Sequence, residues 1–375
     1  MGIVDFSVKE QLQSLLHLHP VHTIDRLHPR KPAVLVKNFH FEPVSIECSE
    51  TGDSAVFGKT MTRHWRKADE EDISRFKEGI RTAIYVLYAL NLPSGQCVVQ
   101  RESVRDYSVY RVNGSSLLEK EGLFIGHPKR RMLSYGADVE CLIQNQKTGG
   151  WVSASSITPA ENGSIGYDGA ISVKGKKVLR PILELRPQPA TNAFQLHQNL
   201  HLLYEKLETY VTNNDLKVIG AGFGRFHVGG HLHVGSHPLT FQDVRKLDLF
   251  LAIPFSLMES SVSPDRRHRY GRLGSARRND FAGFEYRTLP SWYSLIPELR
   301  PVLEWFCYIN EHPDHFPVLN FTSEMLRGYY CGEAHDLTNV SKEIEHICRN
   351  VLPFEDYYRY AVPFFRLIHR NEGVL

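Results

Sequence analysis

Four segments of the chain each carry two chemically capable side chains spaced two residues apart, in sequence that is typical of β-strands. The pairs combine carboxylates, imidazoles and guanidiniums: Asp138 with Glu140, Glu184 with Arg186, His231 with His233, and Glu285 with Arg287. Successive side chains of a strand point to opposite faces of its sheet, so the two members of each pair share one face. We therefore expect one sheet face to gather four carboxylates, two imidazoles and two guanidiniums.

Such a face is electrostatically costly unless it binds something. Two carboxylates about 4 Å apart repel each other by roughly 4 kcal/mol at an effective dielectric constant near 20. Divalent cations remove that repulsion, and arginines recognise phosphate or carboxylate groups. The pattern predicts a site for metal ions and a phosphorylated ligand.

Two of the pairs also have plainer interpretations. Asp138 and Glu140 alone would more often line the solvent face of an edge strand, but the apolar residues 141–143 follow them directly, and acids are poor strand formers. Glu285 and Arg287 alone could form an internal ion pair. The recurrence of the same spacing in four segments favours a functional face.

A glycine-rich run, FHVGGHLHVGSH, holds four histidines at positions 227, 231, 233 and 237. Its glycines predict a backbone that a ligand can approach closely. A trio of imidazoles would suit a catalytic zinc, whereas one imidazole joining several carboxylates would suit magnesium or manganese. The carboxylates elsewhere favour the second alternative, and ordinary surface histidines are a third.

An arginine-rich run, PDRRHRYGRLGSARR, precedes the Glu285 segment and includes Arg266, Arg267 and Arg277. Basic runs are usually solvated surfaces or nucleic-acid patches. The net charge of the chain is only +2, which gives no case for nucleic acid as the main partner. We expect a loop that folds over an anion such as a nucleoside triphosphate.

The elements that must position these residues follow from apolar periodicity and turn signals. Helices are expected over residues 7–17, 69–90, 192–211 and 241–258, and the remainder from 295 to 375 is mainly helical. Strands are expected over residues 32–39, 43–49, 54–58, 134–143, 151–155, 178–187, 217–235 and 283–291, with a hairpin over 96–113. This order predicts an α+β fold.

Composition sets the remaining limits. A chain of 375 residues can form one large or two ordinary domains. No apolar run approaches the roughly 20 residues of a membrane span, and the N-terminal segment lacks a signal-peptide core, so we expect a cytoplasmic location and no membrane partner. The six cysteines are dispersed, which predicts reduced and mostly buried thiols.

The ordered motifs resemble those of the phage-type COOH-NH2 ligase (type 2 amidoligase) family within the glutamine-synthetase-like carboxylate–amine ligases. The resemblance covers about residues 134–295, through GADVECLI, IGYDGA, LELRP, GGHLHVG, RRHRYGRLGSAR and GFEYRTLPSW. It implies a glutamine-synthetase-like antiparallel sheet backed by helices over residues 131–375, with a helical C-terminal tail. Residues 1–130 would form a smaller N-terminal α/β domain.

The resemblance implies ATP-dependent amide formation from a carboxylate and an amine through an acyl-phosphate. By analogy, one Mg²⁺ (or Mn²⁺) would lie among Asp138, His231 and Glu285, and a second between Glu140 and Glu184. One departure is Asp138, where glutamine synthetases carry a longer Glu.

The resemblance also implies roles for cationic side chains. His233 and Arg277 would address the phosphates of ATP, with Arg266 and Arg267 as further nucleotide ligands. Arg287 would act on the transferring phosphoryl group or the substrate carboxylate, so Arg277, Glu285 and Arg287 form the expected catalytic set. Arg186 would bind substrate or hold Glu140, and Asp168 in GYDGA has no assigned role.

Residues 1–130 lie outside this resemblance. Residues 81–113 are faintly similar to the closing part of an ATP-grasp domain, but Arg111 stands where its metal-binding Glu is expected. A degenerate remnant with a docking or substrate-binding role is the expectation. Two alternatives to a ligase stay open: a zinc-dependent hydrolase using the histidine run, and an inactive module that binds a peptide or nucleotide. The identity of the acid and amine and the oligomeric state also stay open.

Overall fold

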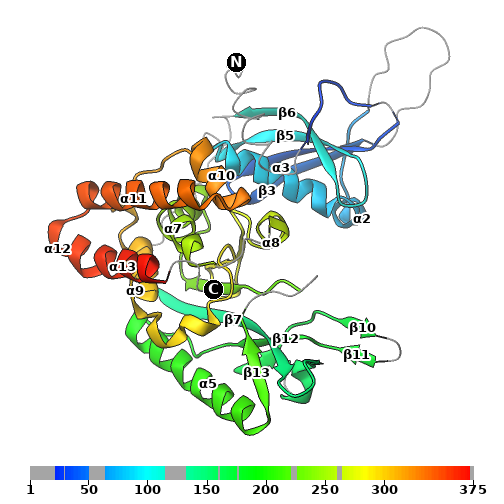
Figure 1. The fold of residues 1–375 in the computed structure, drawn as a ribbon. Helices are drawn as coiled ribbons and strands as arrows, with labels where there is room; N and C mark the ends of the chain where they lie inside the picture. The colour runs from blue at the N-terminus through cyan, green and yellow to red at the C-terminus, as the bar shows by residue number, and fades with distance from the viewer. Residues whose placement is uncertain are drawn as a thin grey trace, which may run out of the picture. The chain divides into compact units, whose positions relative to one another are not determined.

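The chain divides into two compact units in a computed structural model (Figure 1). Unit 1 comprises Met1–Gly126 with Thr240–Gln242 and Asn320–Leu326, and unit 2 comprises the rest of the chain. The structure describes residues 22–28, 30–49, 64–114, 132–158, 161–174, 177–220, 226–259 and 264–371. The expected helix 7–17 and strand 54–58 lie outside these residues.

Unit 1 contains a six-stranded mixed sheet in the order β1-β6-β5-β2-β3-β4. Its strands are β1 (His22–Thr23), β2 (Ala33–Phe39), β3 (Glu42–Ser49), β4 (Arg66–Lys67), β5 (Ser94–Arg101) and β6 (Tyr107–Gly114). Among the strand pairs that the structure describes in this sheet, only β1 and β6 run parallel. The antiparallel pairing of β5 with β6 confirms the predicted hairpin.

The predicted helix 69–90 is divided in two at Phe76. Asp69 caps α2 (Glu70–Arg75) by accepting from the N–H of Asp72, whose side chain accepts from the N–H of Asp69 in return. The helix resumes as α3 (Lys77–Ala89), which packs on the sheet of unit 1. Acidic residues in the first turn therefore marked the helix start correctly, while the interruption was not predicted.

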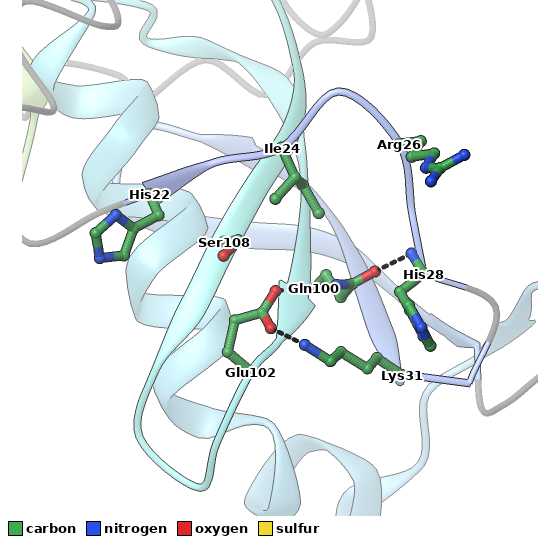
Figure 2. Close-up of a pocket in the computed structure, with 8 residues that line it drawn as sticks. All are labelled: His22, Ile24, Arg26, His28, Lys31, Gln100, Glu102 and Ser108. Carbon is green, nitrogen blue, oxygen red and sulfur yellow. Dashed lines mark hydrogen bonds and ion pairs between the residues drawn. The ribbon is translucent and has the colours of Figure 1, made fainter.

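A depression of about 750 Å³ opens in unit 1, where Gln100 and Ser108 are buried (Figure 2). Lys31 forms an ion pair with Glu102, and the Gln100 side-chain amide donates to the same carboxylate over 2.9 Å. Lys31 is the main reason that the pKa of Glu102 lies below its usual value. None of the predicted site residues lines this depression.

Unit 2 is built on a sheet in which every strand pair of the described residues is antiparallel, in the order β15-β16-β14-β7-β12-β9. The strands are β7 (Ser134–Asn145), β9 (Ile165–Tyr167), β12 (Ile182–Leu185), β14 (Gly230–Gly235), β15 (Ala276–Arg278) and β16 (Phe284–Tyr286). Two more strands, β8 (Trp151–Val152) and β13 (Leu216–Ile219), pair with the far end of β7. The predicted α+β class with a large antiparallel sheet is confirmed.

Several elements are shorter than predicted. The expected strand 178–187 is divided at Pro181 into β11 (Lys177–Leu179), which pairs with β10 (Ser172–Lys174), and β12. Proline lacks the N–H that a continuous ladder needs. The expected strand 283–291 is ordered as a strand only over β16, so Arg287 follows the strand instead of lying within it.

The predicted helix 241–258 changes its hydrogen-bonding pattern along its length. It begins as α6 (Phe241–Leu247), widens into a π-helical turn over Asp248–Ala252, and continues as α7 (Ile253–Phe255) and a 3₁₀ turn over Ser256–Met258. The arginine-rich run expected as a loop begins with a helix, α8 (Pro264–Arg269).

The helical C-terminal part of the chain is confirmed (Figure 1). It comprises α9 (Arg300–Glu311), α10 (Ser323–Cys331), α11 (Ala334–Val351), α12 (Phe354–Asp356) and α13 (Val362–Arg370). Trp305 is fully buried, stacks near Phe364 and donates from Nε1 to the carbonyl of Phe250 over 2.7 Å. This aromatic packing anchors the C-terminal helices to the segment that follows α6.

The long helix α5 (Ala193–Asn213) begins at Asn192, whose side chain caps it, and it packs against the sheet of unit 2. All six cysteines are free, and five of them are buried, which confirms that prediction. Among the residues that the structure describes, no helix is both long and apolar enough to cross a membrane.

Candidate functional site

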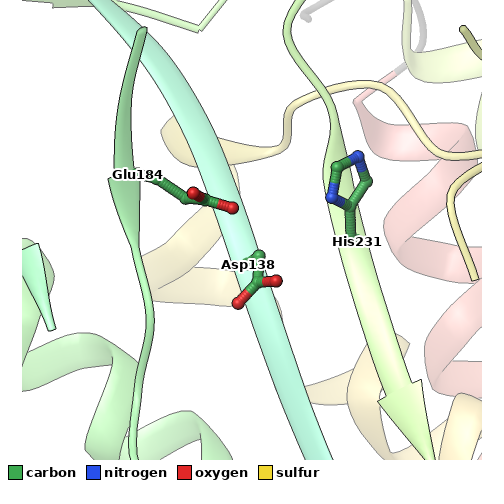
Figure 3. Close-up of side chains that lie close together, drawn as sticks. All are labelled: Asp138, Glu184 and His231. Carbon is green, nitrogen blue, oxygen red and sulfur yellow. The ribbon is translucent and has the colours of Figure 1, made fainter. Parts of the chain in front are cut away.

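The strand register of unit 2 brings the predicted pairs to one face of the sheet. Three cross-strand pairs lie directly opposite each other: Glu140 with Glu184, Asp138 with His231, and Glu285 with His233. Residues opposite each other in an antiparallel ladder project from the same face. The predicted convergence is confirmed, and Figure 3 shows three of these side chains, from β7, β12 and β14.

This face is mostly withdrawn from solvent. Glu140, Glu184, His231 and Glu285 are buried. The carboxylate of Asp138 lies 2.8 Å from Nε2 of His233. Four acids and two imidazoles thus share a small, largely dry area.

Burial changes the proton affinities of two of these acids. It raises the pKa of Glu140 to about 7, against an opposing hydrogen bond from the N–H of Gly229, and the charge of Asp168 adds to the rise. It raises the pKa of Glu184 to about 8, with the charge of Asp138 as the next cause. Both shifts reflect negative charge with too little compensation, which a bound cation would supply.

His231 is held neutral. Burial is the main cause that lowers its pKa well below the usual value, and the nearby charge of Arg287 acts in the same direction. Its Nδ1 atom lies 3.2 Å from Oε1 of Glu285. A neutral imidazole is the form that binds a metal.

Arginines hold the carboxylates at both ends of the face. Arg277 stands opposite Glu285 in the ladder, and its Nε atom lies 2.5 Å from Oε2. Arg287 donates to Oε1 of the same carboxylate over 2.6 Å. At the other end, Arg186 forms an ion pair with Glu184 and donates to the carbonyl of Glu161 over 2.9 Å.

The two arginines that pair with Glu285 differ in exposure. The Arg277 side chain is 64% exposed, whereas that of Arg287 is 28% exposed. The Arg277 side chain is therefore largely hydrated, whereas Arg287 is more confined by its surroundings.

Arg266 and Arg267 are not arranged as the sequence predicted. Arg266 is buried and donates to the carbonyls of Val228 and Leu289, so it braces the start of β14. Its charge still lowers the pKa of Glu140. Arg266 thus acts on the site from within the protein.

Arg267 is fully buried in another network. It lies 3.0 Å from Glu259, donates to the carbonyl of Tyr329, and stands over the Tyr329 ring at 4.7 Å. These contacts hold its guanidinium within the protein and give Arg267 a structural role.

The glycines of the histidine run serve packing more than ligand approach. A Cβ at Gly230 would lie 2.0 Å from Nε1 of Trp292, and one at Gly229 would lie 2.7 Å from Nε2 of His231. Both glycines are buried. The expectation that they leave the backbone open to a ligand is corrected: side chains of the protein already fill that space.

Two groups of side chains on this face could each hold a metal ion. In each group one ligand atom per residue lies within 4.8 Å of the others: Asp138, Glu184 and His231 form the first, and Asp138, His233 and Glu285 form the second. The grouping differs from the predicted one, because Asp138 joins both and Glu140 joins neither. Among the described residues, neither group combines two imidazoles.

Asp168 joins this face although sequence reasoning gave it no role. Its N–H continues the ladder to the carbonyl of Ile182 over 3.1 Å, two residues beyond the pairing of Gly166 with Glu184. The two-residue period therefore places Asp168 on the same face as Glu184. The sequence signal was the acidic residue in GYDGA, two residues after Gly166. It was not recognised because β9 is too short to show a clear strand periodicity.

Comparison with known proteins adds one firm finding. A family model described as phage phiEco32-like COOH.NH2 ligase-type 2 matches residues 135–374, a span that includes every side chain of this site. No curated protein matches the chain. A solved structure described as "Apo GmaS without ligand" aligns over 80% of this chain and 94% of its own, at 9% identity and a TM-score of 0.32.

Proposed function

The chain belongs to the phage phiEco32-like COOH-NH2 ligase type 2 family, and from this premise we propose that it joins a carboxylate to an amine in an ATP-dependent reaction. The observation that carries the proposal is the convergence of four carboxylates and two imidazoles on one sheet face, with Arg277 and Arg287 at one end. Few other activities need that combination in a dry site.

The residues fit divalent cations. Asp138, Glu184 and His231 would hold one ion, and Asp138, His233 and Glu285 a second, with Glu140 near enough to adjust the charge. Mg²⁺ or Mn²⁺ suits these oxygen-rich sets better than zinc, which favours several imidazoles or thiolates. When bound, such ions neutralise carboxylates and phosphate oxygens together.

The protein's own part is to orient and to stabilise charge. Arg277 and Arg287 would bind phosphate oxygens, and Glu285, which pairs with both guanidiniums, would keep them on the site face. A substrate carboxylate oxygen would attack the γ-phosphorus of ATP, breaking its bond to the bridging oxygen and releasing ADP. The amine would then attack the acyl carbon, lose a proton and release phosphate, leaving the amide.

Residues 131–375 would hold this active site on a glutamine-synthetase-like sheet. Residues 1–130 would then serve docking or substrate binding, as a degenerate ATP-grasp remnant. The zinc-hydrolase alternative is weakened because no metal group of the described residues combines two imidazoles. An inactive binding module would use the same side chains, so activity must separate it from a ligase.

Hydroxylamine offers a test that needs no knowledge of the natural amine, because it converts an acyl-phosphate to a hydroxamate. The purified protein with ATP and Mg²⁺ would be screened against amino acids and peptides as the acid. We expect hydroxamate and ADP in equal amounts for at least one acid, and neither product from Glu285→Gln. Nucleotide binding without turnover would indicate an inactive module. Stoichiometric zinc with ATP-independent hydrolysis would indicate the hydrolase.

A further inference from the structure

A buried carboxylate lies behind the arginine end of the site. Asp248 is fully buried and is the first residue of the π-helical turn between α6 and α7. Such turns are rare and often occur at functional sites. Burying a carboxylate costs free energy unless hydrogen bonds compensate it. The partners of Asp248 therefore indicate its role.

Three donors from two segments converge on Asp248. The N–H of Gly274 lies 2.5 Å from Oδ2, and the hydroxyl of Tyr286 lies 2.5 Å from Oδ1. The hydroxyl of Thr288 lies 3.3 Å from Oδ1. Hydrogen bonds to an ionised acceptor are stronger than those between neutral groups, so this is a substantial connection.

The donors flank the residues that face the site. Gly274 comes just before β15, which carries Arg277, while Tyr286 and Thr288 alternate with Glu285 and Arg287. Side chains alternate between faces, so Tyr286 points away from the site while Glu285 points into it. The N–H of Arg287 also donates to the carbonyl of Ser275 over 2.8 Å. Asp248 thus ties the two segments together from the opposite face.

Two of the donors, the N–H of Gly274 and the hydroxyl of Tyr286, are held in the state that donates to Asp248. Gly274 has φ of +79°, a conformation that other residues rarely adopt and that directs its N–H to Asp248. Burial is the main cause that raises the pKa of Tyr286 well above its usual value, with the charge of Asp248 next, so the phenol stays protonated and donates.

We propose that Asp248 is a positioning residue that sets where Arg277 and Arg287 stand relative to Glu285, and thereby sets the affinity of the site for the phosphates of ATP. The effect on ATP affinity rests on the proposed function. The hydrogen bonds that join Asp248 to the two segments do not depend on it. In the absence of the Asp248 charge, the segment 272–278 would move more freely, and Arg277, which is already exposed, would lose its alignment.

The test compares Asp248→Asn with wild type by amide hydrogen exchange and by titration with Mn²⁺ and a non-hydrolysable ATP analogue. We expect at least about tenfold faster exchange in residues 272–278, about tenfold weaker nucleotide binding and unchanged Mn²⁺ affinity, since no proposed metal ligand changes. Tyr286→Phe removes one donor but keeps the charge, so it should give a smaller change in the same direction. Asp280→Asn, at an exposed acid in the next turn, is the matched control and should change neither quantity.

Unchanged exchange in both variants would overturn the inference. So would faster exchange with unaltered nucleotide affinity, because the connection would then not reach the site. Should Asp248→Asn fail to fold, Tyr286→Phe decides between these outcomes. Failure of wild type to bind the nucleotide would instead count against the proposed function, and the exchange data would still decide whether Asp248 holds the segment.

Discussion

Asp138 bonds diagonally to His233, over 2.8 Å, and not to His231, which stands directly opposite it on β14. The other diagonal is also present, because His231 contacts Glu285 at 3.2 Å while His233 is the register partner of Glu285. Each imidazole therefore contacts a carboxylate on a different neighbouring strand. The crossing ties β7, β14 and β16 together on the site face, and it leaves both imidazoles close to both acids.

Glu285→Gln should abolish activity and leave folding nearly unaltered. Glutamine keeps the volume and one acceptor oxygen, and both partner arginines retain access to water, so we expect stability within about 1 kcal/mol of wild type. Loss of the charge removes a proposed metal ligand and the anchor of two arginines. Hydroxamate formation and thermal unfolding check the two parts. Glu298→Gln, at an exposed pair with Arg370, is the matched control. Retained activity would refute the role of Glu285.

Arg277→Lys and Arg287→Lys should affect different stages of the reaction. The exposed Arg277 can close on bound ATP, so its loss should raise the KM for ATP and lower kcat, because lysine cannot make a planar two-pronged contact. The more confined Arg287 should chiefly stabilise charge that develops during transfer. Its replacement should lower kcat by about 10²-fold, roughly 2.7 kcal/mol, with little change in KM.

Steady-state kinetics at saturating acid and amine distinguish the two arginines. Arg278→Lys, at the exposed neighbour on β15, is the control and should behave as wild type. Equal effects on KM alone from both site variants would show that the two arginines are simple nucleotide anchors.

Stability without added metal should fall as the pH rises. The folded-state pKa values of Glu140 and Glu184, about 7 and about 8, exceed the usual 4.5, so the folded protein binds more protons than the unfolded chain in this interval. The stability that these two acids contribute is then fully present below pH 4.5 and is lost progressively up to about pH 8. For Glu140 the loss is on the order of 3 kcal/mol at most.

Divalent cations should reverse that loss, because they stabilise the ionised carboxylates. We expect Mg²⁺ or Mn²⁺ to raise the melting temperature strongly at about pH 8.5 and hardly at about pH 5. Glu184→Gln should flatten the pH dependence and weaken the effect of metal. A melting temperature that is independent of both pH and divalent cations would show that the ionisation of these acids does not destabilise the fold and that they do not bind the ions.

Gly229→Ala should impair the site by displacing His231. The added Cβ would lie 2.7 Å from Nε2 of that imidazole, and the N–H of Gly229 also supports Glu140 over 2.6 Å. We expect metal affinity to fall by about tenfold or more, by analogy with changes to groups that orient metal ligands. Gly220→Ala, where the nearest heavy atom would be 3.6 Å away, is the control. A Mn²⁺ affinity of Gly229→Ala equal to that of Gly220→Ala would contradict the role of Gly229 in positioning His231.

The sequence revealed the composition of the face because strand periodicity is local. Residues two apart must share a face, so the four pairs were predictable without knowing which strands are neighbours. The order of strands and the diagonal contacts of Asp138 were not, since they depend on register between segments far apart in the chain. Asp138 joins the first candidate metal group with His231, its partner in the register, and the second with His233, its diagonal contact.

The arginine run shows a different limit. A basic loop and a helix with buried arginines have similar sequences, and only tertiary packing distinguishes them. Arg267 is enclosed by Glu259 and the ring of Tyr329, which is 62 residues away. Asp248 had no predicted role within the expected helix 241–258, because the π-helical turn and the donors Gly274, Tyr286 and Thr288 depend on tertiary structure.

The strand order of unit 2 has a consequence for how the protein reaches its native state. The central strand β7 is synthesised first, yet its two site neighbours β12 and β14 come later, and the contact between Asp138 and His233 spans 95 residues. Pairings of such high contact order form slowly because a long loop must close first. Until β12 and β14 are synthesised, the part of β7 that carries Asp138 and Glu140 lacks its partner strands, and unpaired strand edges are prone to aggregation. Recovery of metal binding should therefore lag behind recovery of helical signal during refolding, and a ribosome-bound chain shorter than residue 287 should hold no complete site.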